Sequence, residues 1–267
     1  MTTTMLSARL RSMTPMAACL LTLLLVLPGR AAGADCVLNV GWTPYGLYTF
    51  AGEDGQAQGI DADLFAAVAT EIGCRANFRQ LPWARILLEL QSGTLDATSS
   101  ASRTTERDAF ALFSQPYRLA ETAIYVRRNE VPRFPLQSLT DVPKARMRLG
   151  YVVGYYYGPT FPALQQDPTF AASTDGAADY EININKLLRN RIDGFLVDDT
   201  GVMIGWAKKL GVADQMERHP LRLASDELHL MLSRRTVSFE QLAKIDGALQ
   251  RMRADGRMQA IFDRYLK

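Results

Sequence analysis

The stretch Leu90-Gln-Ser-Gly-Thr-Leu-Asp-Ala-Thr-Ser-Ser-Ala-Ser-Arg-Thr-Thr-Glu-Arg107 joins the end of one helix to a strand and to the start of a second helix. Apolar residues before it recur with helical spacing, at Trp83, Ile86, Leu87 and Leu90. Gly93 predicts the end of that helix. Residues 95–98 then predict a short strand, and Thr105 with Asp108 three residues later has the form of a capping box that opens the next helix.

The same alternation of strand and helix extends in both directions along the chain. Val37 to Gly41 is typical of a short buried strand, and the next apolar helical face carries Leu64, Phe65, Val68 and Ile72. The pattern restarts after about residue 119, with strands expected at 148–153 and 194–197. A helical segment is expected from residue 238 to the end. Such alternation predicts an α/β protein with mostly parallel sheets.

The N-terminal segment differs from the rest of the chain. Arg9 and Arg11 form a basic start, residues 16–28 are almost wholly apolar, and Ala32-Gly33-Ala34 offers a small-x-small cleavage site. This pattern predicts a secretory signal peptide over residues 1–34. The apolar run is shorter than the roughly 20 residues of a membrane span, although an uncleaved anchor remains an alternative. We therefore expect a secreted protein, located in the periplasm.

The charge of the chain depends on this segment. The 267 residues include 30 basic and 28 acidic side chains. Cleavage after Ala34 removes three arginines and no acid, which leaves 27 basic against 28 acidic residues. The mature chain then has no basic excess of the kind that binds nucleic acid, and we expect no nucleic-acid partner.

Two of the three cysteines, Cys36 and Cys74, lie in the mature chain. An even number of cysteines in an oxidising compartment predicts one disulfide between them. Two buried free thiols are the alternative. No CxxC spacing of a redox or metal site is present, and we expect no cofactor or metal.

Arg107 and Asp198 are the most informative charged pair. The arginine fork fits a carboxylate with two parallel hydrogen bonds, and an aspartate fits an ammonium group. If the fold brings them to one cleft, they select a zwitterion such as an α-amino acid. Charge type alone is weak evidence, because most surface charges contribute little. The sequence around each residue strengthens the interpretation.

Five motifs occur in an order that resembles a known family. They are Tyr45-Gly-Leu-Tyr-Thr-Phe50, Gly59-Ile-Asp-Ala-Asp-Leu64, Leu90 through Asp96, Thr105-Glu-Arg107 with Phe113-Ser-Gln-Pro-Tyr117, and Ala254-Asp-Gly256 with Ile261 and Tyr265. Over essentially all of the mature chain, the sequence resembles the family 3 extracellular solute-binding proteins, the periplasmic amino-acid receptors of ABC importers.

The resemblance implies a two-lobe periplasmic binding protein-like fold of type II. Each lobe would be a mostly parallel sheet flanked by helices, and two hinge crossings would join the lobes. Lobe 1 would comprise residues 35–118 and 229–267, and lobe 2 residues 119–228. The ligand, a small polar solute, would bind between them, where open α/β sheets place their ligands. The implied partner is the membrane permease of an ABC importer, and we expect a monomer.

The resemblance also implies roles for individual residues. Arg107 would clamp the ligand carboxylate, with backbone and hydroxyl groups of Ser100 and Ser102 completing that site. Asp198 would take the ligand ammonium, although a register shift would give this role to Asp199.

Aromatic residues would surround the remainder of the ligand. Tyr45 and Trp83 match positions that pack on the ligand side chain, which gives apolar burial or cation–π contact. The second-lobe loop departs from the family, because Gly154-Tyr-Tyr-Tyr-Gly158 stands where Gly-Thr-Thr is common. These tyrosines, with Tyr156 as a candidate ligand contact, would narrow or reshape the cleft. Ordinary amino-acid specificity is therefore left open.

Two other functions compete with transport. The same scaffold hosts cyclohexadienyl (arogenate) dehydratases, which need a general acid over the substrate. Glu89, Glu106 and Asp199 are carboxylates that could approach the cleft, but no spacing singles one out. A ligand-sensing module of a receptor is the other alternative. We expect a binding protein that is not an enzyme.

Overall fold

The computed structural model of this protein describes residues 1–4 and 36–266. The expected signal peptide therefore lies outside the described residues, apart from its first four. The chain divides into two compact units, Met1–Ala34 and Asp35–Lys267, and the fold below is that of the second unit. No helix in the described part of the chain is long and apolar enough to cross a membrane.

The first sheet has the strand order β4-β1-β5-β13-β6, and β7 also pairs with β13. The strands are β1 (Cys36–Trp42), β4 (Cys74–Gln80), β5 (Ala97–Ser102), β6 (Ala111–Phe113), β7 (Arg118–Glu121) and β13 (Ser225–Ser233). β1 runs parallel to β4 and β5. β13 is antiparallel to its three neighbours.

The second sheet has the order β10-β9-β11-β8-β12. Its strands are β8 (Ala123–Arg127), β9 (Leu149–Val152), β10 (Thr174–Ala177), β11 (Gly194–Val197) and β12 (Met216–Arg218). β9 pairs in parallel with β10 and β11. β8 is antiparallel to β11 and β12. The α/β class is as expected, and parallel pairing is confined to the half of each sheet that strand–helix alternation builds. A two-residue hairpin, β2 (Phe50–Ala51) with β3 (Ala57–Gln58), stands apart from both sheets.

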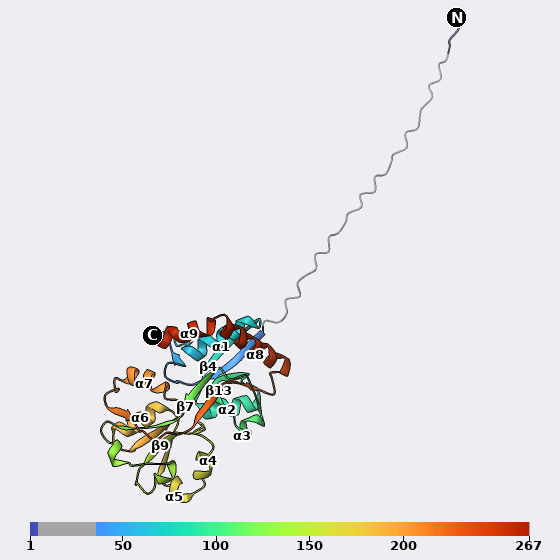
Figure 1. The fold of residues 1–267 in the computed structure, drawn as a ribbon. Helices are drawn as coiled ribbons and strands as arrows, with labels where there is room; N and C mark the ends of the chain where they lie inside the picture. The colour runs from blue at the N-terminus through green and yellow to red at the C-terminus, as the bar shows by residue number, and fades with distance from the viewer. Residues whose placement is uncertain (5–35, 267) are drawn as a thin grey trace. The chain divides into compact units, whose positions relative to one another are not determined.

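The helices accompany these sheets in chain order. In the first part of the chain they are α1 (Ile60–Glu71), α2 (Trp83–Ser92) and α3 (Thr105–Asp108). In the middle they are η1 (Val131–Arg133), η2 (Leu139–Asp141), α4 (Phe161–Leu164), α5 (Pro168–Ala171), α6 (Tyr180–Leu188) and α7 (Val202–Leu210). The last two, α8 (Phe239–Ala254) and α9 (Arg257–Leu266), lie beside α1 although they are far from it in sequence (Figure 1).

Local signals explain where several helices begin and end. Ser238 and Gln241 form a reciprocal capping box at the start of α8. α2 ends at Gly93, whose φ of 81° is the left-handed conformation that favours glycine. α3 begins as predicted at Thr105, but its cap is Thr104, because the Thr104 hydroxyl accepts from the backbone N–H of Arg107 at 3.2 Å.

The apolar face predicted on α1 packs into the core of the first sheet. Leu64, Phe65 and Val68 are almost completely buried and belong to one cluster with Leu38 and Val40 of β1. Cys36 and Cys74 are register partners at the start of β1 and β4. Their α-carbons are 4.4 Å apart and the disulfide between them is formed, which confirms the prediction.

The chain passes from one sheet to the other twice. It leaves the first sheet after β7 and returns to it with β13. The two connections are adjacent, because the backbone N–H of Thr122 donates to the carbonyl of Ala224 at 2.9 Å. The loop after β11 is attached at the same point, where the Thr200 N–H donates to the Glu121 carbonyl at 3.0 Å. The segments beside this double crossing form one edge of the site described next.

Candidate ligand-binding cleft

A cavity lies where the ends of strands from both sheets meet. Its lining includes residues at the carboxyl ends of β1 and β5 of the first sheet, and residues that follow β9 and β11 of the second. Open α/β sheets bind ligands at this edge of their strands. All the ligand-contact residues predicted from the sequence line this cavity: Tyr45, Trp83, Ser100, Ser102, Arg107, Tyr156 and Asp198. The fold thus brings them together, while their roles toward a ligand stay predictions.

Arg107 is held at the cavity by the loop that precedes it. Its guanidinium donates to the carbonyl of Ser102 at 2.8 Å and to the carbonyl of Gly154 at 2.9 Å. The guanidinium also lies over the Trp83 ring, 5.3 Å from the ring centre. Burial lowers the pKa of Arg107, although an arginine stays charged at any physiological pH. Two of its five N–H groups are occupied in this way, and the others remain for an anion.

Gly154 joins the loop after β9 to the first sheet. Its carbonyl also accepts a hydrogen bond from the Trp83 indole N–H at 2.8 Å. Its φ of 81° lies in the left-handed region, and a Cβ would stand 3.2 Å from Trp83 Cδ1. Conformation and space both favour glycine here. A single carbonyl therefore receives two donors from the opposite side of the cleft.

The tyrosines after Gly154 have three different environments. Tyr155 lies edge-on to Tyr45, Trp83 and Tyr180, with ring centres 5.6 to 6.0 Å apart. Tyr156 is half-buried and lines the cavity, whereas Tyr157 is a core residue whose hydroxyl accepts from the Val152 N–H at 2.8 Å. The cavity keeps about 30 Å³ of free space. That is room for a water molecule or two, so a solute enters only when the walls move apart.

Asp198 is the acidic residue of the second sheet at this cavity. Its carboxylate accepts from the Tyr180 hydroxyl, and its own backbone N–H donates to that hydroxyl at 3.0 Å. Burial, with a contribution from the neighbouring Asp199 charge, raises the pKa of Asp198 to about 7. Tyr45 has a buried hydroxyl without a partner among the described residues. Burial and the charge of Asp198 raise the pKa of Tyr45 well above its ordinary value.

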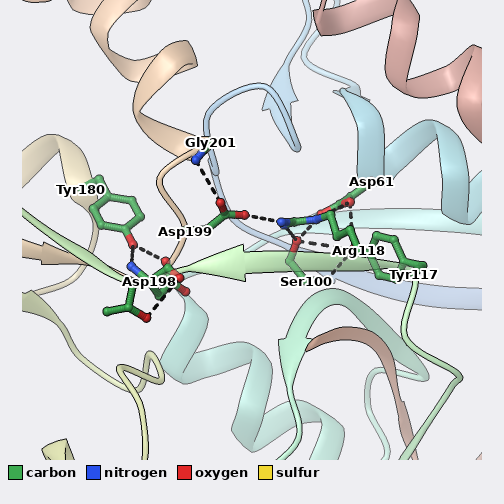
Figure 2. Close-up of polar contacts among 9 residues, drawn as sticks. Asp61, Ser100, Tyr117, Arg118, Tyr180, Asp198, Asp199 and Gly201 are labelled. Atoms are coloured by element: carbon green, nitrogen blue, oxygen red, sulfur yellow. Dashed lines mark hydrogen bonds and ion pairs between the residues drawn. The ribbon is translucent and has the colours of Figure 1, made fainter. Parts of the chain in front are cut away.

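Asp199 has a different role, although it follows Asp198 directly. Figure 2 shows Asp199 directed toward Arg118 and Asp198 directed toward Tyr180. Asp199 forms an ion pair with Arg118 and accepts from the Gly201 N–H at 2.9 Å. It is absent from the cavity lining, which includes Asp198. The geometry therefore favours Asp198 over Asp199 as the acidic group available to a ligand.

The sequence analysis missed the network around Arg118. The Arg118 guanidinium donates to the Ser100 hydroxyl at 2.6 Å and lies 3.7 Å from Asp61, a second acidic residue of the cavity lining. The Tyr117 hydroxyl donates to Asp61 at 2.8 Å. The only sequence signal was the position of Asp61 and Tyr117 inside recognised motifs, because a single arginine after a motif indicates nothing by itself.

Other carboxylates considered as general acids lie elsewhere. Glu89 is paired with Arg79 and Arg85, each at 2.8 Å, and neither Glu89 nor Glu106 lines the cavity. Within residues 1–4 and 36–266, no group of three or more His, Cys, Asp or Glu side chains is arranged to hold a metal ion.

Comparison with known proteins agrees with this geometry. Residues 38–267 match the family model of the bacterial extracellular solute-binding proteins, family 3. The chain is 26% identical over 247 residues to a probable amino-acid-binding protein, YxeM, of Bacillus subtilis (strain 168), covering 86% of this chain and 84% of that protein. It is 25% identical over 218 residues to ABC transporter arginine-binding protein 1 of Escherichia coli (strain K12), covering 80% of this chain and 84% of that protein.

A solved structure shows the same fold at lower identity. An ancestral amino acid-binding protein, AncCDT-1, described as a precursor of cyclohexadienyl dehydratase, superposes with a TM-score of 0.70 at 23% identity. The match covers 86% of this chain and 96% of that one. Because the family model spans nearly the whole described fold, this chain belongs to the bacterial extracellular solute-binding proteins of family 3.

Proposed function

We propose that this protein captures a free amino acid, or a closely related zwitterion, in the cleft between its two sheets and delivers it to the permease of an ABC importer. One observation carries the proposal: the Arg107 guanidinium and the Asp198 carboxylate line the same cavity from opposite sheets. Opposite charges on the two walls match the two charges of a zwitterion.

The carboxylate of the ligand would bind at Arg107. The guanidinium is fixed by two carbonyls and offers its remaining N–H groups as a planar fork. Ser100 and Ser102 flank this position on the lining and would add backbone and hydroxyl groups. Binding a carboxylate to a buried, pre-positioned arginine avoids the ordering cost that a mobile side chain would bring.

The ammonium of the ligand would bind at Asp198. Its carboxylate is oriented by Tyr180, and the hydroxyl of Tyr45 has no other partner among the described residues. The rings of Tyr45 and Trp83 would pack on the aliphatic part of the ligand, and Tyr156 would close one side.

Closure would follow from the same contacts. We propose lobe 1 as residues 35–118 with 229–267, and lobe 2 as residues 119–228, turning about the paired connections at Thr122 and Ala224. A ligand that touches Arg107 in one lobe and Asp198 in the other stabilises only the closed arrangement. The permease would then recognise the closed form of a monomer.

The cellular setting is part of the proposal. Residues 1–34 would act as a cleaved signal peptide that directs the chain to the periplasm, in keeping with a family of extracellular proteins. We propose that the protein has no catalytic activity of its own. Its two curated relatives carry the names of binding proteins, and the carboxylates Glu89 and Glu106 lie away from the cavity.

Isothermal titration calorimetry of the mature protein against the standard amino acids tests this function. A solute at 100 times its dissociation constant should stabilise the fold by roughly 2.7 kcal/mol, so a thermal-shift screen finds candidates first. The expected result is tight binding of at least one amino acid and no binding of its N-acetyl or carboxamide derivative, since each lacks one charge. Equal binding of those derivatives would contradict the two-charge site.

A further inference from the structure

We infer that the side chain of the captured amino acid is uncharged, because Arg118 already occupies the acidic subsite beside the cavity as an internal cation. This inference rests on the proposed function and names the class of amino acid. It concerns a part of the cleft away from Arg107 and Asp198, where the side chain of a bound amino acid would extend.

Arg118 is a buried cation between two carboxylates. Its side chain is 5% exposed, and it forms ion pairs with Asp61 and Asp199, whose side chains are 1% and 4% exposed. The guanidinium is stacked on the Tyr48 ring, 3.6 Å from the ring centre. A cation between carboxylates and over an aromatic face is the arrangement by which proteins bind guanidinium and ammonium ligands. Here the chain supplies that cation itself (Figure 2).

The two carboxylates have no oxygen left without a donor. The oxygens of Asp61 accept from the hydroxyls of Tyr117 and Ser100. Those of Asp199 accept from Arg118 and from the Gly201 N–H. A second cation brought by a ligand would have to displace one of these donors. It would also meet the like charge of Arg118, and like charges at close quarters cost several kcal/mol.

The rest of this end of the cavity is neutral. The lining residues contributed by β1, α1, β4 and β5 carry hydroxyl, methyl and aromatic groups, among them Val40, Trp42, Thr43, Ala62, Phe78 and Thr98. The charged lining residues are Asp61, Arg107 and Asp198. Arg118 neutralises the first, and the carboxylate and ammonium of the ligand match the other two. A neutral side chain therefore completes the charge balance.

The decisive test compares ligands that differ only in side-chain charge. L-Arginine and L-citrulline are nearly isosteric, as are L-lysine and L-norleucine. We expect the unmodified mature protein to bind the cationic member of each pair at least about tenfold more weakly than the neutral one by calorimetry. Tighter binding of arginine than citrulline, or of lysine than norleucine, would overturn the inference.

Arg118→Met should reverse this preference. It keeps the apolar stem, removes the cation, and leaves Asp61, Asp199 and the Tyr48 ring facing a new space. Arginine and lysine should then bind at least about tenfold better relative to citrulline and norleucine than they do to the parent. An unchanged ratio would contradict the role assigned to Arg118.

Two further variants keep this test conclusive. The double variant Arg118→Met with Asp199→Asn leaves one buried carboxylate instead of two, so it should fold if the single variant does not, and it should still gain affinity for the cations. Arg218→Met is the matched control, because Arg218 makes a surface ion pair with Glu121 outside the cavity. The ligand ratios of that control should equal those of the parent.

The outcomes separate this inference from the function on which it rests. If amino acids bind and the cationic ones bind best, the inference fails while the proposed function stands. If no amino acid binds the parent or any variant, the proposed function fails and the inference with it. Preference for neutral side chains in the parent, lost in Arg118→Met, supports both.

Discussion

The guanidinium of Arg107 donates a hydrogen bond to the carbonyl of Gly154, 2.9 Å away, and so connects α3 to the loop that follows β9 in the other sheet. The indole of Trp83 donates to the same carbonyl at 2.8 Å. The residue proposed to bind the ligand carboxylate therefore also holds the two sides of the cleft together. Its substitution should affect ligand binding and closure at once.

Arg107→Ala should lose most of the affinity for the amino acid that calorimetry identifies. Removing one partner of a buried charge pair costs about 2–5 kcal/mol, which is roughly thirty- to several-thousand-fold. Arg107→Lys should recover part of the loss, because it restores the charge without the planar fork. Solution scattering should show less compaction on adding ligand. Parent-like affinity in Arg107→Ala would refute the carboxylate-clamp assignment.

Ligand affinity should fall as the pH drops through about 7. The pKa of Asp198 is raised to about 7 by burial, so below that pH the free protein holds a neutral carboxyl there. An ammonium ligand requires the ionised form, and its binding then releases a proton. Affinity should decrease by up to about tenfold per pH unit below 7 and be constant just above it. Calorimetry in buffers of different ionisation enthalpy measures both effects.

Asp198→Asn provides the control for this pH dependence. It should bind the ligand weakly with a flat pH profile. The folded-state pKa of Asp198 lies above its unfolded value, so the parent loses stability as the pH rises from about 4 to about 7. The free energy of unfolding of the variant should exceed that of the parent by as much as about 3–4 kcal/mol at pH 8, and by less at pH 5. Equal stability differences at both pH values would argue against a shifted Asp198.

Reduction of the Cys36–Cys74 disulfide should destabilise the first sheet. The bridge joins residues 38 apart, so reduction should cost about 3–4 kcal/mol in the chain-entropy account. Urea unfolding with and without a strong reductant, and of Cys36→Ser with Cys74→Ser, should show matching losses. Thiol titration of the denatured, unreduced mature protein should detect no free thiol, and two free thiols would contradict the bridge.

Gly205→Ala should separate α7 from the loop that carries Tyr45. A Cβ on Gly205 would stand 2.6 Å from the backbone of both Gly46 and Leu47, closer than packing allows. Backbone atoms cannot yield as side chains do, so we expect a loss of about 1–3 kcal/mol in stability and weaker ligand binding.

Gly247→Ala is the matched control for Gly205→Ala. It places the same methyl group in helix α8, where the nearest neighbour is the flexible end of Arg251 at 3.2 Å. That variant should be as stable as the parent, or more stable by about 0.4–1 kcal/mol. Both variants unfolding alike in urea would show that close backbone approach at Gly205 is unimportant.

Much of this protein follows from local patterns. The helical spacing of Leu64, Phe65 and Val68, the stop at Gly93 and the α/β alternation were readable because each depends on residues close in sequence. The cysteine pairing followed from number and compartment. The candidate contacts, including Arg107 and Asp198, came from short motifs in a family-like order.

Other features depend on residues that meet only when the chain folds. The antiparallel half of each sheet arises from returning strands, and the alternation of strands and helices does not predict it. Arg118, Asp61 and Asp199 are separated by up to 138 positions, and no local pattern relates their charges. The choice between Asp198 and Asp199 was open for the same reason. Adjacent side chains point to different surroundings, and only the three-dimensional structure brings Tyr180 to one carboxylate and Arg118 to the other.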